Sequence, residues 1–227
     1  DSIFITMTNL IKKIFYGAFI EKKWMVAISK QMLTMTERNI INTKEITNIP
    51  VNPNYNFYAD PFYSIDKSKI RLEGLDKKTG MGDIIEVSKD DFQEQKLILS
   101  GQHYSYPFSF KWQEKEYLLP EVASHSKQYF APAEALNKPN ILKGLEEKRI
   151  VDATLLFHRD RFYLFFGENK DAHSILHLYT SEDFENEFKR HPSSPISMSP
   201  KTSRMGGRII QQGNRLYRLG QNNEGEY

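Results

Sequence analysis

The segment Tyr58-Ala59-Asp60-Pro61-Phe62 opens the first of several short strand pairs whose spacing decides the fold. Asp60 begins a strand that is followed, after a polar turn, by a second strand. Equivalent pairs begin at Tyr106 and at Asp152, so that both intervals are 46 residues, and a fourth pair begins near Met205. A period of this length lies within the range of about 40 to 50 residues that is typical of propeller blades. The sequence therefore predicts a β-propeller.

Third strands occur at matching offsets in the first and third repeats. Residues 83–88 and 174–180 have the composition of strands, and each leads into an Asp-Phe turn, Asp91-Phe92 and Asp183-Phe184. The aromatic share of 13% suits strands with one packed face. The alternative is a β-sandwich whose strands are evenly spaced by accident.

The chain divides near residue 50. In residues 1–50, apolar side chains recur at helical spacing over 10–19, which predicts a short helix or packed arm, and residues 24–28 are expected to form a closing strand. Residues 51–227 hold roughly three and a half blades at this period. A ring of five blades would need roughly 60 to 80 further residues. We therefore expect an all-β, five-bladed propeller that is incomplete in this chain and truncated at its C-terminal end.

The composition argues against several classes of protein and site. The net charge is +2 without a dense basic stripe, so nucleic acid is not an expected partner. Cysteine is absent, which excludes disulfides and thiolate metal sites. The six histidines lack compact metal-ligand spacing, and Gly206-Gly207 has no downstream Lys-Ser/Thr pair of a P-loop, so we expect neither a metal nor a cofactor.

The apolar N-terminal region is interrupted by charged residues. It falls short of the ~18 apolar residues that a span needs, so we expect no transmembrane segment. The region also lacks the charge and small-residue pattern of a signal peptide. We therefore expect a cytoplasmic location.

Eight short motifs follow one another in the order and spacing of a known family. They are Ala59-Asp60-Pro61-Phe62, His103-Tyr104-Ser105-Tyr106-Pro107-Phe108, Tyr117-Leu118-Leu119-Pro120-Glu121, Val151-Asp152-Ala153-Thr154, Leu176-His177-Leu178-Tyr179-Thr180-Ser181, His191-Pro192, Arg204-Met205-Gly206-Gly207-Arg208 and Arg218-Leu219-Gly220-Gln221. Over about residues 24–227 the sequence resembles the N-terminal domain family of glucosamine inositolphosphorylceramide transferases. The resemblance implies a five-bladed propeller related to glycoside hydrolase family 43, a fused or partner glycosyltransferase domain, and a role in glycan, glycolipid or polysaccharide biosynthesis.

Three carboxylates are candidates for catalysis. The innermost strand of each blade lines the channel, so Asp60 and Asp152 should converge, and glycoside cleavage needs two carboxyl groups in the roles of base or nucleophile and of acid. The resemblance implies that Asp60 is the general base and that Asp152 tunes the acid and orients the substrate. The hydrolases carry the acid, a glutamic acid, on the fourth blade, where this chain has Arg204. Glu121 is our candidate for the acid, and Glu168 is a weaker one.

Five further residues are predicted to bind the substrate. Tyr106 shares the strand position of the two aspartates, and His103 adjoins the same strand. Arg204 and Arg208 can bind a carboxylate or phosphate through their planar guanidinium groups, and Gln221 belongs to the last motif. The expected ligand is a sugar, a nucleotide-sugar or a glycolipid.

Three functions stay open at this point. The leading hypothesis is a carbohydrate-active domain of glycan or glycolipid assembly that binds a sugar or sugar-phosphate in the central funnel, and it favours an enzyme. The alternatives are a family 43-like glycoside hydrolase and a noncatalytic sugar-binding or scaffold module for a partner glycosyltransferase. Carboxylates that converge on an open funnel would favour catalysis, whereas buried carboxylates tied to backbone N–H groups would favour a structural role.

Overall fold

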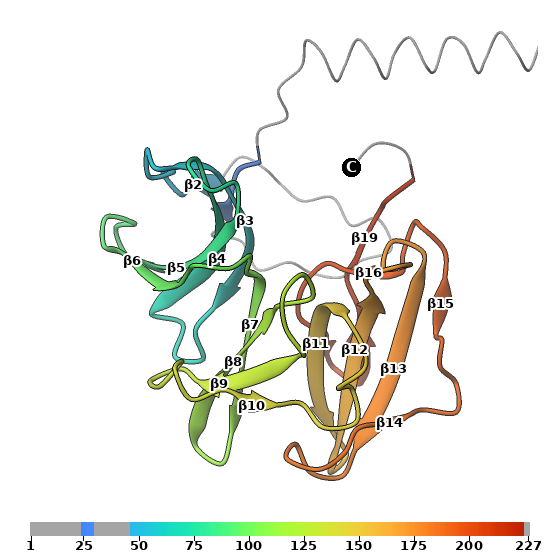
Figure 1. Cartoon of the computed structure of the whole chain (residues 1–227). Coiled ribbons are helices and arrows are strands. Elements are labelled where there is room, and N and C mark those ends of the chain that lie inside the picture. Colours follow the sequence, from blue (N-terminus) through green and yellow to red (C-terminus); the bar gives the residue numbers. More distant parts are fainter. Residues whose placement is uncertain (1–23, 30–45, 225–227) are drawn as a thin grey trace, which may run out of the picture.

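The computed structural model describes residues 24–29 and 46–224, which form an all-β structure built mainly from three antiparallel four-stranded sheets (Figure 1). Blade I consists of β3 (Tyr55–Tyr63), β4 (Lys69–Asp76), β5 (Gly82–Ser88) and β6 (Gln95–Leu99). Blade II consists of β7 (Ser105–Trp112), β8 (Lys115–Glu121), β9 (Tyr129–Pro132) and β10 (Asn140–Ile141). Blade III consists of β11 (Ile150–His158), β12 (Arg161–Glu168), β13 (Ile175–Ser181) and β14 (Lys189–Arg190), with β15 (Ser197–Met198) also paired to β13.

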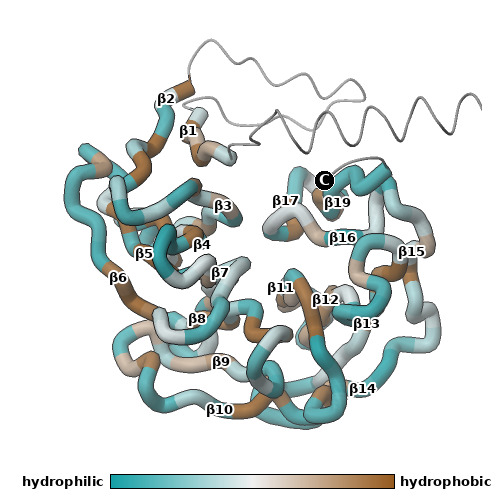
Figure 2. The backbone as a smooth tube through the Cα atoms, turned by 45° about the horizontal axis from the view of Figure 1, so that its top comes forward, coloured by the Kyte–Doolittle hydropathy of each residue, from teal (hydrophilic) through white to brown (hydrophobic). Residues whose placement is uncertain are grey.

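The first strands of the three blades, β3, β7 and β11, are the innermost and face a common centre (Figure 2). In each blade the strands lie in chain order from the centre outward, because each is joined to the next by a short antiparallel connection. This radial arrangement confirms the predicted β-propeller, and the three repeats found in the sequence correspond to blades I to III.

The fourth hairpin differs from the prediction. A continuous strand was expected from Met205 to Ile210, but the chain instead forms two short paired segments. In one segment β16 (Arg204–Met205) pairs with β19 (Gly220–Gln221), and in the other β17 (Ile210–Gln212) pairs with β18 (Arg215–Tyr217). Gly207 lies between them at φ 133°, a conformation that side chains disfavour, and it interrupts the strand.

The N-terminal strand lies slightly later than predicted. Residues 24–26 are irregular, and β1 (Ala27–Ser29) pairs with β2 (Ile46–Asn48) in a sheet of their own. The helix or arm expected over residues 10–19 lies outside the described residues. Within the described part of the chain, no helix has the length and apolar character needed to span a membrane.

Two hydrophobic clusters hold the blades together. The larger joins blades II and III with Phe62 of blade I and Met205 of β16, and the smaller packs Val26 and Ile49 from the N-terminal segments onto blade I. Burial of apolar surface is the main driving force for such contacts. The N-terminal segments are therefore packed against side chains of β3, β4 and β5 in blade I.

A buried ion-pair network joins blade I to blade II. The Arg71 guanidinium donates from Nη1 to Glu116 Oε1 at 2.6 Å and to Ser109 Oγ at 2.8 Å, and from Nε to Glu86 Oε2 at 3.0 Å. The planar guanidinium satisfies two carboxylates and a hydroxyl at once. This network ties β4 and β5 of blade I to β7 and β8 of blade II.

Each innermost strand carries a β-bulge at the same place. In blade I the register shifts between Ala59 and Phe62, and blades II and III have the same shift between Ser105 and Phe108 and between Val151 and Thr154. Asp60, Tyr106 and Asp152 sit in these bulges at φ 49°, 44° and 52°. Non-glycine residues rarely adopt this left-handed conformation, which often marks functional positions. The 46-residue repeat is thus a repeat of bulges that re-aim one side chain per blade.

Candidate functional site

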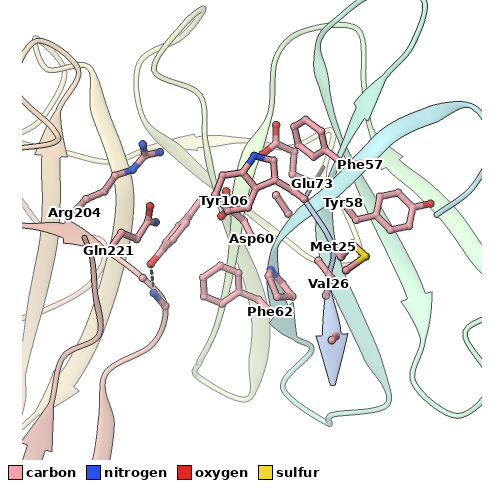
Figure 3. Close-up of a pocket in the computed structure, with 16 residues that line it drawn as sticks. Met25, Val26, Phe57, Tyr58, Asp60, Phe62, Glu73, Tyr106, Arg204 and Gln221 are labelled. Carbon is pink, nitrogen blue, oxygen red and sulfur yellow. Dashed lines mark hydrogen bonds between the residues drawn. The ribbon is translucent and has the colours of Figure 1, made fainter. Parts of the chain in front are cut away.

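A cavity of about 620 Å³ opens beside β3, between blade I and β16. One side is formed by apolar and aromatic residues of the N-terminal segment and of β3, together with Asp60 and Glu73, and Arg204 and Gln221 lie on the other side (Figure 3). The full lining comprises Trp24, Met25, Val26, Ala27, Phe57, Tyr58, Ala59, Asp60, Pro61, Phe62, Glu73, Tyr106, Arg204, Gly206, Gly207 and Gln221. An apolar wall with a few convergent polar groups is typical of a small-molecule site.

Asp60 lies in the wall of this cavity. Its bulge turns the side chain toward the centre, where the carboxylate accepts a hydrogen bond from the backbone N–H of Tyr106. Burial raises the pKa of Asp60 to about 6, and the nearby charge of Asp152 adds to the rise, whereas Arg204 and the Tyr106 N–H oppose it. At neutral pH Asp60 is therefore mostly ionised and able to accept hydrogen bonds.

Asp152 occupies the equivalent bulge of blade III but does not line the cavity. The residue is only 1% exposed, and its Oδ2 accepts a hydrogen bond from Arg204 Nε at 2.6 Å. Its Oδ1 is buried, with no hydrogen-bond partner among the described residues. Burial raises the pKa of Asp152 despite the opposing charge of Arg204.

Glu121 lies beside Asp152, at the end of β8. Glu121 Oε2 accepts the backbone N–H of Asp152 at 3.0 Å, and the two carboxyl groups are close enough to form a hydrogen bond when one is protonated. Burial also raises the pKa of Glu121. A shared proton between two such carboxyl groups satisfies both, because two ionised carboxylates would repel each other. Glu121 and Asp152 thus form a buried pair behind the cavity.

Glu73 is the residue of the site that sequence reasoning missed. It lies on β4 opposite Ala59, is 8% exposed, and lines the cavity next to Asp60. Burial raises the pKa of Glu73 to about 8, the negative charges of Asp60, Glu121 and Asp152 add to the rise, and Arg204 opposes it. Glu73 is therefore mostly protonated at neutral pH. Its one sequence signal is its equivalence to Glu121, which the unequal hairpin turns of blades I and II conceal.

Tyr106 and Gln221 hold the cavity wall in place. The buried Tyr106 hydroxyl bonds Thr154 Oγ1 at 2.8 Å and accepts the backbone N–H of Gly207 at 3.1 Å, so it joins blades II and III to the segment after β16 (Figure 3). Gln221 Nε2 donates to the Met205 carbonyl at 2.7 Å, which braces β16 against β19. Both side chains also face the cavity.

The remaining candidates lie away from the cavity lining. His103 Nδ1 accepts the backbone N–H of Gly82 at 2.8 Å, and burial lowers the pKa of this histidine. Arg208 packs over the ring of Phe108 at 4.7 Å from its centroid and donates to the Tyr63 carbonyl at 3.4 Å. Glu168 forms ion pairs with Lys148 and Lys170 in blade III.

The geometry brings together a chemically mixed set of groups. One mostly ionised carboxylate, one mostly neutral carboxylic acid, a guanidinium and a carboxamide face the same space. Such a set can accept and donate hydrogen bonds to a polyhydroxylated ligand at the same time. Within residues 24–29 and 46–224, no cluster of three or more His, Cys, Asp or Glu side chains is arranged to hold a metal ion.

Comparison with solved structures supports the propeller fold. An exo-β-1,3-galactanase from Phanerochaete chrysosporium superposes with a TM-score of 0.52 at 7% identity, covering 76% of this chain and 45% of the galactanase chain. A thermostable family-43 glycoside hydrolase superposes with a TM-score of 0.46 at 12% identity and covers 78% of both chains. At an identity of 7% the likeness to the galactanase concerns the fold alone.

Comparison of sequences identifies the family. A rice protein (Oryza sativa subsp. japonica) named glucosamine inositolphosphorylceramide transferase 1 is 29% identical over an alignment of 189 residues that covers 76% of this chain. The same alignment covers 25% of the rice protein, so the chain spans about a quarter of the length of the curated relatives it matches. The family model described as glucosamine inositolphosphorylceramide transferase 1, N-terminal, matches residues 34–227. As the eight motifs predicted, the chain belongs to the glucosamine inositolphosphorylceramide transferase 1 N-terminal domain family.

Proposed function

We propose that this propeller domain binds the sugar part of a glycolipid or glycan intermediate in the cavity beside β3. The observation that carries the proposal is the convergence of Asp60, Glu73 and Arg204 on one cavity of about 620 Å³. The cavity size suits a ligand of one or a few sugar rings, since small-molecule sites measure about 300 to 1,000 Å³. Aromatic residues of the N-terminal segment and of β3, on the same side of the cavity as Asp60 and Glu73, offer apolar faces for a sugar ring.

The family points to the class of ligand. The rice relative is named glucosamine inositolphosphorylceramide transferase 1. We infer that this domain serves a glycosyltransferase of glycolipid assembly, holding a sugar or sugar-phosphate group of donor or acceptor. Arg204 supports this assignment, because it lines the cavity and a planar guanidinium is a good partner for an oxyanion.

A second candidate function is glycoside hydrolysis. It is favoured by one observation, namely that Asp60 and Glu73 line one cavity with pKa values of about 6 and about 8, as a base and an acid would. Two features count against it. Arg204 stands where the resemblance implies a glutamic acid, and Glu121 and Asp152 are engaged with each other behind the wall.

Ligand binding tests the proposal directly. Methyl α-D-glucosaminide, methyl α-D-glucopyranoside and myo-inositol 1-phosphate would be titrated against the domain by calorimetry and by saturation-transfer NMR. At least one should bind, and Asp60→Asn should weaken that binding about tenfold, the effect of one charge-assisted hydrogen bond. The matched control is Asp90→Asn on an exposed turn, which should bind as the wild type does.

Two outcomes would count against this proposal. One is failure of all three compounds to bind, and the other is unchanged affinity in Asp60→Asn. Release of 4-nitrophenol from a 4-nitrophenyl glycoside, abolished by Asp60→Asn and by Glu73→Gln, would instead favour the hydrolase.

A further inference from the structure

Glu73 and Glu121 occupy the same position in successive blades. Glu73 pairs with Ala59, the residue before the bulge of blade I, and Glu121 pairs with Ser105, the residue before the bulge of blade II. In blade III this position is Gly167, opposite Val151. The repeat therefore places a glutamate beside the bulge in two blades, and the surroundings determine what each does.

The two glutamates differ in the backbone donor available to them. Glu121 accepts the N–H of Asp152, which is the bulge residue of the following blade. The equivalent N–H in the preceding pair of blades belongs to Tyr106, and it is donated to Asp60. Among the described residues, no hydrogen bond or ion pair reaches the Glu73 carboxyl group. Asp60 has thus taken the donor that would otherwise satisfy Glu73.

A buried carboxyl group without a partner is costly, and ionisation makes the cost much larger. The charged groups that face Glu73 are Asp60 on β3, Glu121 on β8, Asp152 on β11 and Arg204 on β16, and the three acids together outweigh the arginine. Their effect, added to burial, keeps the carboxyl group protonated at neutral pH. A neutral carboxylic acid carries one O–H donor, and Glu73 lines the cavity, so this donor is within reach of a ligand there.

The space for this carboxyl group is provided by Gly82 at the start of β5. A Cβ atom at position 82 would lie 2.6 Å from Glu73 Oε1 and 2.3 Å from the Tyr104 carbonyl oxygen, both far inside van der Waals contact. Any side chain at this position would displace the Glu73 carboxyl group. The local backbone is therefore shaped around Glu73, as expected for a side chain held in a defined place.

We propose that Glu73 is a hydrogen-bond donor of the sugar site: its carboxylic acid donates to a ligand oxygen that carries no hydrogen of its own, such as a ring or glycosidic oxygen, while Asp60 accepts from a neighbouring hydroxyl. The proposal rests on the sugar-binding function proposed above. It gives the two adjacent carboxyl groups opposite roles, and it makes the site select for ligands that present an acceptor and a donor side by side.

The protonation of Glu73 can be measured without a ligand. The domain would be labelled with ¹³C at the glutamate side-chain carboxyl carbon, and its NMR spectrum recorded from pH 4 to pH 10. The resonance that disappears in Glu73→Gln should titrate near pH 8, as the pKa of about 8 requires. Glu94→Gln, at an exposed position, serves as the control and should leave the Glu73 resonance in place. Titration of Glu73 in that ordinary range would overturn the proposal.

Binding of the same three compounds tests the donor role. Affinity of the wild type should fall about three- to tenfold between pH 7 and pH 9.5, the effect of losing one neutral hydrogen bond. Glu73→Gln keeps an N–H donor of similar shape, so it should bind without this alkaline fall. Glu73→Ala should bind weakly at both pH values, and wild-type affinity in Glu73→Ala would refute the donor role. Failure of every compound to bind the wild type counts against the sugar-binding function, whereas an ordinary titration of Glu73 counts against this inference alone.

Discussion

Asp60 and Asp152 hold the same position on the innermost strands of blades I and III, in bulges of the same register and with nearly the same φ. Their surroundings differ. Asp152 is 1% exposed and paired with Arg204 and Glu121, whereas Asp60 lines the cavity and receives a backbone N–H from Tyr106. One position of the repeat is thus buried in an ion pair in one blade and forms part of the cavity wall in another.

The difference shows which property of the site comes from the repeat and which comes from its neighbours. The bulge sets where each carboxyl group lies, because the backbone geometry is the same in all three blades. The charges and donors of adjacent strands set whether that carboxyl group is ionised and whether it is free to bind. Substituting those neighbours one at a time tests whether they cause the difference between Asp60 and Asp152.

The largest expected effect follows from removing the cation of the Asp152 pair. Arg204→Met should lower the free energy of unfolding by about 3 to 5 kcal/mol, because it leaves a buried carboxyl group without its ion-pair partner. Urea denaturation followed by fluorescence measures this change. Part of the loss should be recovered by the double substitution Arg204→Met with Asp152→Asn, which also removes the acid.

A surface ion pair provides the control for this prediction. Arg161 and Glu182 form a contact at 3.1 Å with side chains that are 44% and 80% exposed. Arg161→Met should change stability little, since exposed pairs contribute little. A similar effect of Arg204→Met and Arg161→Met would show that Asp152 does not depend on its partner, and the contrast with Asp60 would then be lost.

The second effect is the pH dependence of stability that arises from Glu73 in the cavity wall. The pKa of Glu73 is about 8 in the fold and 4.5 when unperturbed, so the folded state binds this proton more tightly than the unfolded chain does. The associated stabilisation is therefore present at low pH and is lost as the pH rises from about 4.5 to about 8. The wild type should lose about 2 to 4 kcal/mol relative to Glu73→Gln between pH 5 and pH 9.

This difference is measured by urea denaturation of both proteins across the pH range. Subtracting the Glu73→Gln values removes the contributions of titrating groups that do not interact with Glu73. Parallel pH profiles for the two proteins would mean that Glu73 ionises as easily in the fold as in the unfolded chain.

The smallest expected effect concerns the Tyr106 hydroxyl, which joins blades II and III to the segment after β16. Tyr106→Phe removes a hydroxyl that bonds Thr154 and the backbone N–H of Gly207. It should cost about 1 to 2 kcal/mol of stability, because a buried donor and acceptor lose their shared partner. Tyr117→Phe in the same blade, where the hydroxyl makes no hydrogen bond to the described residues, should be nearly neutral. Equal effects in both variants would exclude a specific role for the Tyr106 hydroxyl.

Much of the fold could be predicted from local features of the sequence. The hairpins at Asp60, Tyr106 and Asp152 were placed correctly, because each combines an alternating apolar pattern with a polar turn and returns after the same interval. The fourth hairpin was predicted as continuous because each of its two segments has a strand-like composition. Gly207 interrupts it through a backbone conformation that depends on packing against the neighbouring blade as well as on residue type.

The sequence by itself determined the propeller class, the family and the strand positions that face the centre, because these depend on period, pattern and motif. The tertiary structure decided how the carboxyl groups are divided between the cavity and the buried pair behind it. That division depends on contacts between residues far apart in the chain, such as Arg204 with Asp152, and on the unequal turns that hide the equivalence of Glu73 and Glu121. Asp60, Glu73 and Asp152 acquire their different pKa values only when folded blades place them in one low-dielectric site.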